Sequence, residues 1–276
     1  MPETGLDGLP PLREVIANHG LNAKKSLGQN FLLDLNLTSK IARTASDLAN
    51  SDIVEIGPGP GGLTRALLAE GARHVYAIER DERCLAALAM ISEAYPDRLT
   101  VIPGDALTVD IGSIGTAPRR IVSNLPYNIA TPLLLRWLHQ INAVSEFVLM
   151  FQSEVADRLA AQPGTKAYGR LSIIAQWLCD VRRAFSLPPR AFTPPPKVDS
   201  AVVVLAPRPA PLAPAEFQAL EIVTQAAFGQ RRKMLRSSLR SLSLDLEALG
   251  IDPSQRAENL EIEAFCRLAN ALMPRR

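Results

Sequence analysis

The sequence has few cysteines, few aromatic residues and no long hydrophobic run. Its 276 residues include 3 cysteines, which lie far apart, with no C-x-x-C pair and no histidine at ligand spacing. This pattern argues against a disulfide framework or a zinc site, so we predict no metal. No segment approaches the roughly 18 uncharged apolar residues of a membrane span, so we predict no membrane association.

The sequence also lacks a secretion signal and a strong charge of either sign. Residues 1–11 carry acids and prolines where a signal peptide would need a basic stretch and an apolar run, so we expect a soluble, cytoplasmic protein. The 30 Lys and Arg residues against 28 Asp and Glu give a net charge of +2, which is too small to indicate nucleic acid by itself. The hydrophobic fraction of 47% can fill a core and excludes a wholly disordered chain.

A regular alternation of strands and helices begins near residue 52. Before it we expect a loose tail and two helices, over 1–11, 12–20 and 36–45. Strands are predicted over 53–56, 74–78, 99–102, 120–123, 146–151, 181–187 and 201–205, with helices over 63–70, 81–94, 131–139, 153–161 and 169–178. Strands separated by helices imply an α/β fold with a mostly parallel sheet covered on both faces. The last two strands, joined only by a proline-rich loop, should form an antiparallel hairpin at one edge of this sheet.

A run of prolines after residue 206 marks a second region. No strand pattern returns beyond it, and apolar residues recur at helical spacing over 216–227, 231–242 and 262–272. We therefore predict three parts: a tail, basic arm and helices over 1–50, the α/β domain over 51–206, and a C-terminal helical domain over 207–276.

A glycine-rich loop lies between the first strand of the alternating region and the helix after it. Gly57, Gly59 and Gly62 satisfy G-x-G-x-x-G, in which glycines allow a tight turn and close approach of a ligand to the backbone. Glu79 and Asp105 end the next two strands, where they could accept hydrogen bonds from ribose hydroxyls and an adenine amine. Open α/β sheets bind ligands at this edge, so the set favours an adenosine ligand, either a nicotinamide cofactor or S-adenosylmethionine.

The tetrapeptide at 124–127 follows the fourth strand and should lie beside the same crevice. Methyl transfer to an exocyclic amine requires a delocalised nitrogen lone pair to point at the methyl group of a sulfonium. The side-chain oxygen of Asn124 and the carbonyl of Leu125 can accept the two N–H bonds of such an amine. Pro126 fixes the backbone and removes a competing donor, and Tyr127 offers a ring for stacking on a base. Catalysis would then be mostly a matter of orientation.

Five motifs occur in order along the chain: KSLGQNFL at 25–32, EIGPGPG at 55–61, NLPY at 124–127, FTPPPKVDS at 192–200 and FGQRRK at 228–233. Together they resemble the ribosomal RNA adenine dimethyltransferases, most closely the KsgA/RsmA family, and the match runs from about Lys24 to the C-terminus. The resemblance implies a Rossmann-like methyltransferase fold with a small C-terminal helical domain. It also implies S-adenosylmethionine-dependent conversion of two adjacent adenosines near the 3′ end of small-subunit (16S) ribosomal RNA to N6,N6-dimethyladenosine, in ribosome assembly.

The resemblance also implies roles for particular residues, with the small ribosomal subunit and its RNA as partners. Residues implied to contact the cofactor are Asn30, Leu32, Gly57, Gly59, Glu79, Asp105 and Asn124. Phe192 would stack on the target adenine opposite Tyr127, and the three prolines that follow it would keep its loop stiff.

Basic residues of the arm and of a predicted C-terminal helix are candidates for binding RNA: Lys24, Lys25, Arg231, Arg232, Lys233, Arg236 and Arg240. Three of these arginines recur every four residues and would share one face of a helix over 231–242. No acid occurs between 228 and 243, so we predict a stripe that binds phosphates.

Other functions fit the motifs less well. A nicotinamide dehydrogenase shares the glycine loop but leaves the tetrapeptide unexplained. DNA adenine methyltransferases usually begin the tetrapeptide with Asp, and glutamine methyltransferases tend to have Pro second. The antibiotic-resistance branch that acts on large-subunit RNA shares the tetrapeptide, and the motif at 228–233 argues against it. A non-enzymatic assembly factor for immature small subunits stays open and is compatible with catalysis. No long apolar stripe demands a partner, so we expect a monomer.

Overall fold

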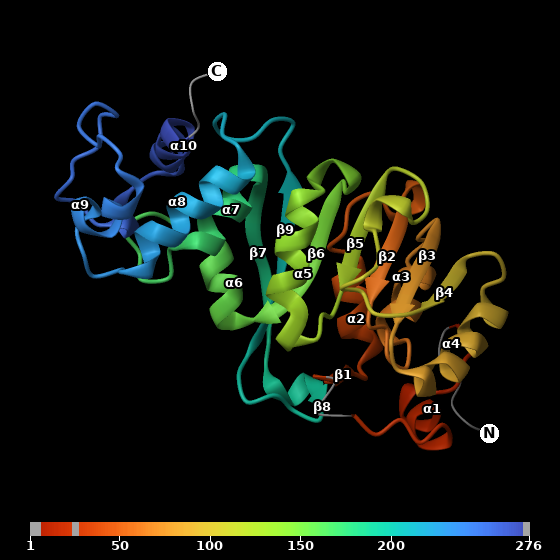
Figure 1. Ribbon diagram of the computed structural model, residues 1–276. Coiled ribbons are helices and arrows are strands. Elements are labelled where there is room, and N and C mark those ends of the chain that lie inside the picture. Colours follow the sequence, from red (N-terminus) through yellow and green to blue (C-terminus); the bar gives the residue numbers. More distant parts are fainter. Residues whose placement is uncertain (1–6, 24–27, 273–276) are drawn as a thin grey trace. The chain divides into compact units, whose positions relative to one another are not determined.

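The computed structural model describes residues 7–23 and 28–272 and divides into two compact units. Unit 1 comprises Met1–Ser153 and Arg183–Leu205, and unit 2 comprises Glu154–Arg182 and Ala206–Arg276. Figure 1 labels the helices and strands of both units.

A seven-stranded sheet forms the centre of the fold. Its order is β4-β3-β2-β5-β6-β9-β7, with β2 at Asp52–Ile56, β3 at His74–Glu79, β4 at Leu99–Pro103, β5 at Arg119–Ser123, β6 at Glu146–Gln152, β7 at Cys179–Leu187 and β9 at Ser200–Pro207. The pairs β4-β3, β3-β2, β2-β5 and β5-β6 are parallel, and β6-β9 is antiparallel. The predicted α/β fold is confirmed, and the two late strands lie next to each other at one edge.

Five α-helices belong to unit 1: α1 (Leu12–Asn18), α2 (Leu35–Ala42), α3 (Gly62–Ala69), α4 (Glu82–Ala94) and α5 (Tyr127–His139). Short 3-10 turns occur at Leu48–Asn50, Ile111–Ser113, Ile141–Ala143 and Pro189–Ala191. Helix α5 begins four residues before its predicted start at 131, and it contains Pro132 in its second turn. Instead Pro126 stands at the N-cap, so the helix starts directly after the extended tetrapeptide backbone.

A cluster of buried apolar side chains in unit 1 lies on one face of the sheet. Alternate strand residues supply it, as at Val75 and Ala77 or Val148 and Met150, because successive side chains of a strand point to opposite faces. Helices α2, α3 and α4 add further buried apolar side chains to the same cluster, including Ile41, Leu67 and Leu88.

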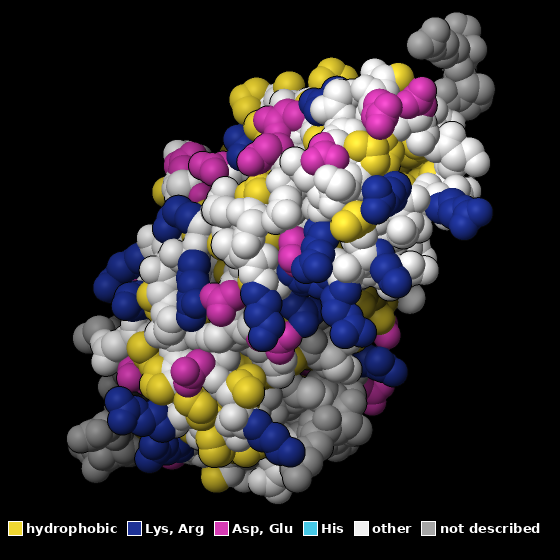
Figure 2. All heavy atoms as spheres, turned by 90° about the vertical axis from the view of Figure 1, so that its left-hand side faces the viewer, with side chains coloured by type: hydrophobic (Ala, Val, Ile, Leu, Met, Phe, Trp, Pro, Cys, Tyr) yellow, Lys and Arg dark blue, Asp and Glu magenta, His cyan; other side chains and the backbone are white. Residues whose placement is uncertain are grey.

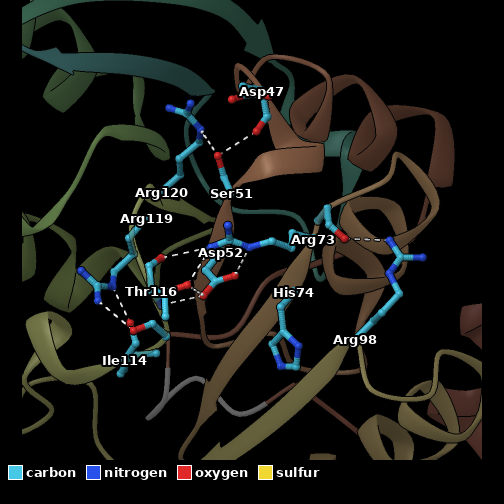
Figure 3. A network of polar contacts seen from close by, with 12 residues as sticks. Asp47, Ser51, Asp52, Arg73, His74, Arg98, Ile114, Thr116, Arg119 and Arg120 are labelled. Carbon is cyan, nitrogen blue, oxygen red and sulfur yellow. Dashed lines mark hydrogen bonds and ion pairs between the residues drawn. The ribbon is translucent and has the colours of Figure 1, made fainter.

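The edge of the sheet at which the parallel strands begin is closed by a polar network (Figure 3). Asp52, the first residue of β2, accepts hydrogen bonds from Arg73 at 2.7 Å and from the Thr116 backbone N–H at 2.6 Å. Burial opposes the charge of Asp52, but these partners hold its pKa below the usual range. At the start of β5, Arg119 donates to the carbonyls of Ile114 and Ala143. This edge is thus occupied by structural contacts, which leaves the opposite edge for a ligand.

The amino-terminal segment is not a loose tail over its described residues 7–11, contrary to the prediction. Asp7 and Arg65 form a buried ion pair, with Oδ2 and Oδ1 of Asp7 each 2.6 Å from a guanidinium nitrogen. The same guanidinium donates to the carbonyl of Pro10 at 2.7 Å. Arg65 lies on α3, so this pair ties the segment to the helix that follows the glycine loop.

Two very short strands join distant parts of unit 1. Strand β1 (Phe31–Leu32) pairs antiparallel with β8 (Phe192–Thr193), so that Leu32 lies opposite Phe192. Two-residue strands carry no periodic signal, and neither was predicted.

Unit 2 is helical. It contains α6 (Ser153–Leu159), which starts at the last residue before the unit boundary, α7 (Arg170–Leu178), α8 (Phe217–Gly229), α9 (Leu235–Ser238) and α10 (Ile262–Leu272), with 3-10 turns at Arg240–Leu242 and Ala257–Asn259. Helix α8 packs against α7 and α10, and Phe228 stacks on Phe265. The division into units groups α6 and α7 with the C-terminal helices, whereas the predicted boundary at 206/207 assigned them to the sheet domain. Both helices follow strands in the sequence, as helices of an α/β domain do, so the sequence did not indicate that they belong to unit 2.

The helix predicted over 231–242 is wrong. Residues 230–233 form turns, and Met234 is extended (φ −66°, ψ 154°) and bridges to Arg256. Only the four residues of α9 and a 3-10 turn follow. The backbone N–H of Leu235 donates to Gln255 rather than to a preceding turn, so a tertiary pairing interrupts the helix.

The substitution Asp7→Asn tests the ion pair with Arg65. Removing one partner of a buried ion pair leaves an uncompensated charge, and we expect the free energy of unfolding to fall by about 3 kcal/mol. Urea denaturation measures it. The matched control is Glu14→Gln, which removes an exposed acid from the same segment and should change stability by less than about 0.5 kcal/mol. Equal stability of Asp7→Asn and the native protein would contradict a structural role for the pair.

Candidate active site

The glycine loop connects β2 to α3 at the carboxyl edge of the parallel sheet. Gly59 has φ 57°, a left-handed conformation that favours glycine. Gly62 is required for a different reason, because a Cβ there would lie 2.8 Å from the backbone oxygen of Leu32. The loop therefore holds both a left-handed turn and the close approach of the arm that carries β1.

Glu79, at the end of β3, has a buried carboxylate held by backbone donors. Its Oε2 accepts the N–H of Gly59 at 2.9 Å, and its Oε1 accepts the N–H of Asp81 at 2.7 Å. Burial raises the pKa of Glu79, and these hydrogen bonds oppose the rise. Each carboxylate oxygen has two lone pairs, so the side chain keeps acceptor capacity for hydroxyl groups.

Asp105, beyond the end of β4, is half-buried. Its Oδ1 accepts the backbone N–H of Leu107 at 2.9 Å, and its Oδ2 lies 3.2 Å from Nη1 of Arg80. Arg80 was not predicted as a site residue, although it directly follows Glu79 at the end of a strand. The ion pair sets the orientation of Asp105 and adds a positive charge to this part of the site.

The tetrapeptide follows β5 with its first side chain turned toward the arm. Nδ2 of Asn124 donates to the backbone carbonyl of Asn30 at 3.1 Å. A carbonyl oxygen can only accept, so the amide nitrogen must face it and Oδ1 points the other way. No hydrogen bond to that oxygen occurs among the described residues. Asn124 is therefore held as an oriented acceptor.

Tyr127 begins α5, and its hydroxyl lies 2.6 Å from Oγ of the fully buried Ser200. Burial raises the pKa of Tyr127, so the phenol stays protonated at neutral pH. Ser200 ends the motif at 192–200, and no role was predicted for it.

One open pocket in unit 1 gathers most of the predicted site, with about 1100 Å³ of empty space, part of it open to solvent. The predicted residues that line it are Asn30, Leu32, Gly57, Gly59, Glu79, Asp105, Asn124, Leu125, Pro126 and Tyr127. The glycine loop, the two acids and the tetrapeptide therefore face one shared space.

Phe192 is not brought to this pocket. It is 3% exposed, belongs to the cluster of buried apolar side chains on one face of the sheet and lies opposite Leu32 in the short β1-β8 pair. In this structure its ring is thus buried and does not line the pocket with Tyr127.

The predicted RNA-binding residues are distributed unevenly. Lys24 and Lys25 lie outside the described residues. Arg231 is ion-paired with Glu258 at 2.9 Å and donates to the carbonyl of Lys166 at 2.6 Å, so its guanidinium serves unit 2 itself. The remaining four are exposed on unit 2: Arg232, Lys233, Arg236 and Arg240. Figure 2 shows basic side chains gathered near the middle of one molecular face, with acidic side chains interspersed among them.

Within 7–23 and 28–272, no group of three or more His, Cys, Asp or Glu side chains could hold a metal ion. Among the described helices, none combines the length and apolar character that a membrane crossing requires.

Glu55 is a further residue that lines the pocket. It begins the motif at 55–61, but no role was predicted for it. It is 2% exposed, and Oγ1 of Thr64 donates to its Oε2 at 2.6 Å. Burial raises its pKa from 4.5 to about 8, with the nearby Glu79 adding to the rise. At neutral pH Glu55 is therefore mostly a neutral acid at the base of the glycine loop.

The substitution Glu55→Gln should remove a pH dependence of stability. Between its ordinary pKa and the raised folded-state pKa, the folded chain keeps a proton that the unfolded chain releases, so stability falls as pH rises. Relative to the variant, the native protein should lose about 1.4 kcal/mol per pH unit between about pH 5 and 8. Urea denaturation of the ligand-free proteins over this range measures the difference. A difference that does not change with pH would contradict a buried, neutral Glu55.

The chain as a whole is similar to a known protein family. A family model described as ribosomal RNA adenine dimethylase matches residues 20–273. The ribosomal RNA small subunit methyltransferase A of Rhodospirillum rubrum is 62% identical over 98% of this chain and 95% of its own length. That of Mesorhizobium japonicum is 59% identical over 97% of this chain and 99% of its own length.

Two crystal structures resemble the fold. A dimethyladenosine transferase from Plasmodium falciparum has a TM-score of 0.74 and 26% identity, covering 85% of this chain and 94% of its own. The 23S rRNA methyltransferase ErmE has a TM-score of 0.70 and 27% identity, covering 88% of this chain and 99% of its own. The chain thus has a Rossmann-like methyltransferase fold, and it belongs to the ribosomal RNA adenine dimethylase family.

Proposed function

We propose that this chain uses S-adenosylmethionine to dimethylate the N6 amines of two adjacent adenosines near the 3′ end of small-subunit ribosomal RNA, during ribosome assembly. The observation that carries the proposal is the oriented amide of Asn124, which shares a pocket with two acids suited to adenosine. The choice of the small subunit is supported by relatives of that name at 59% and 62% identity, against 27% for the 23S enzyme.

The residues of the pocket fit S-adenosylmethionine. Glu79 retains acceptor capacity for ribose hydroxyls, and Asp105 can accept from an adenine amine. The backbone of Asn30 and Leu32 forms the wall toward Asn124. When bound there, this cofactor supplies an electrophilic methyl group.

The tetrapeptide would orient the target amine. Oδ1 of Asn124 accepts one N–H bond of the adenine amine, and the carbonyl of Leu125 accepts the other. Pro126 offers no competing donor, and the ring of Tyr127 stacks on the base. No strong general base is needed, because the alkylated nitrogen loses its proton readily. The chain therefore acts mainly by orientation, which can contribute several kcal/mol to a barrier.

We assign stacking on the target adenine to Tyr127 alone, because Phe192 is buried. Affinity for the RNA backbone is assigned to the exposed residues Arg232, Lys233, Arg236 and Arg240 of unit 2. Exposed arginines suit phosphates because their charge is permanent and their donors are planar. We further propose that the chain acts as a monomer in the cytoplasm, where small subunits are assembled.

The substitution Asn124→Ala should separate catalysis from binding. Loss of the oriented acceptor should reduce transfer of labelled methyl groups to small-subunit RNA at least about 100-fold, while subunit affinity stays within about twofold. Asn142→Ala, at an exposed position outside the pocket, is the matched control for both measurements. Methylation by the Asn124 variant at more than a tenth of the native rate would contradict the role of this amide. Loss of subunit binding would contradict the division between tetrapeptide and basic surface.

Replacing Arg232, Arg236 and Arg240 together by alanine should weaken RNA binding and flatten its salt dependence. If each arginine neutralises one phosphate, the slope of log K against log salt should decrease by about 2.1–2.7 in magnitude, at roughly 0.7–0.9 per contact. Filter binding or anisotropy across a salt series gives this slope. Arg267→Ala, whose guanidinium donates to the carbonyl of Leu249 in the same unit, serves as control. An unchanged slope in the triple variant would make these arginines ordinary solvated surface.

A further inference from the structure

The contact between Tyr127 and Ser200 joins two segments that are 73 residues apart in the sequence. Tyr127 is partly buried and lines the pocket, whereas Ser200 is fully buried and lies outside the pocket lining. Their oxygens are 2.6 Å apart. Ser200 therefore acts on the pocket only through the hydroxyl of Tyr127.

The backbone of Ser200 is firmly placed. Ser200 begins β9 and lies opposite Gln152 in the antiparallel β6-β9 pair. The preceding carbonyl, of Asp199, accepts the N–H of Ser153 at 2.9 Å. The backbone that carries the Ser200 hydroxyl is therefore fixed, whereas the phenol of Tyr127 that it contacts can rotate.

A tyrosine side chain turns about two bonds, and the backbone of Tyr127 is set by Pro126 and the start of α5. The hydrogen bond to Ser200 fixes the remaining freedom of the ring. A stacking platform is useful only when the plane of its ring is set before the base arrives, since any ordering at that moment costs entropy.

We propose that Ser200 is a positioning residue: its hydroxyl holds the ring of Tyr127 in the plane that receives the target base. This inference depends on the proposed function, which makes Tyr127 the stacking partner. It also gives a role to the last residue of the motif at 192–200.

The two methyl transfers should depend on Ser200 to different extents. Each transfer breaks the S–CH3 bond of the sulfonium, forms one N–CH3 bond and releases one proton from the nitrogen. The unmodified amine has two N–H bonds for the oxygens of Asn124 and Leu125, but the monomethylated amine has one. Stacking on Tyr127 therefore carries a larger share of the orientation in the second transfer.

The substitution Ser200→Ala should consequently cause monomethyladenosine to accumulate. We expect the ratio of N6-methyladenosine to N6,N6-dimethyladenosine at equal total methylation to rise at least about fivefold, as loss of orientation slows the second step. Affinity for S-adenosylmethionine should stay within about twofold, because the glycine loop and its acids are untouched. Mass spectrometry of nucleosides from the modified RNA measures the ratio.

Tyr127→Phe provides the second arm of a double-mutant cycle. This variant keeps the ring but removes the hydroxyl, so it should raise the same ratio, and the double variant should match either single variant rather than their product. The control is Ser51→Ala, which removes a fully buried hydroxyl that donates to the carbonyl of Asp47 at the other edge of the sheet. It should lower stability without changing the product ratio. An unchanged ratio in Ser200→Ala, or additive effects in the cycle, would overturn the proposal.

A binding measurement separates this inference from the proposed function. An RNA oligonucleotide with 2-aminopurine at a target position loses fluorescence when the base stacks on Tyr127, and Ser200→Ala should weaken that quenching. Quenching by the native protein without methyl transfer would overturn the proposed function and leave the positioning role standing. Methyl transfer by the native protein with undiminished quenching in Ser200→Ala would overturn the positioning role alone.

Discussion

The hydrogen bond from the Asn124 amide to the carbonyl of Asn30 is the interaction on which the rest of the site depends. An unrestrained amide can present either its oxygen or its nitrogen to a target amine, and only the oxygen accepts N–H bonds. A backbone carbonyl removes the ambiguity because it can only accept. The orientation of the Asn124 side chain is thus set by a segment 94 residues earlier in the chain.

Several other contacts keep that carbonyl in place. Leu32, two residues on, approaches Gly62 so closely that no side chain fits there, and it pairs with Phe192 in the β1-β8 ladder. The buried Asp7–Arg65 pair ties the amino-terminal segment to α3, the helix that follows the glycine loop. The arm and the amino-terminal segment are therefore both fixed to the region of the glycine loop and α3. The pocket wall at Asn30 and Leu32 and the Asn124 amide are therefore held in place by the same set of contacts.

The sequence predicted what depends on local pattern and on the edge of a parallel sheet. Gly59, Glu79, Asp105 and Asn124 each lie at the end of a parallel strand or just beyond it, and such positions meet at one edge of an α/β sheet. Contacts across long separations had no such signal. The charge of Asp7 gave no indication of a partner 58 residues away. At Met234, a bridge to Arg256 interrupts a segment whose apolar residues have helical spacing.

The most direct test of the account is transfer of labelled methyl groups from S-adenosylmethionine to small and large ribosomal subunits from cells that lack adenine dimethylation. The account predicts label on small-subunit RNA, recovered as N6,N6-dimethyladenosine at two adjacent positions near the 3′ end. Label on large-subunit RNA would leave the pocket chemistry intact and contradict the assigned substrate. Absence of label on both subunits, with S-adenosylmethionine still bound, would contradict the proposed reaction on ribosomal RNA.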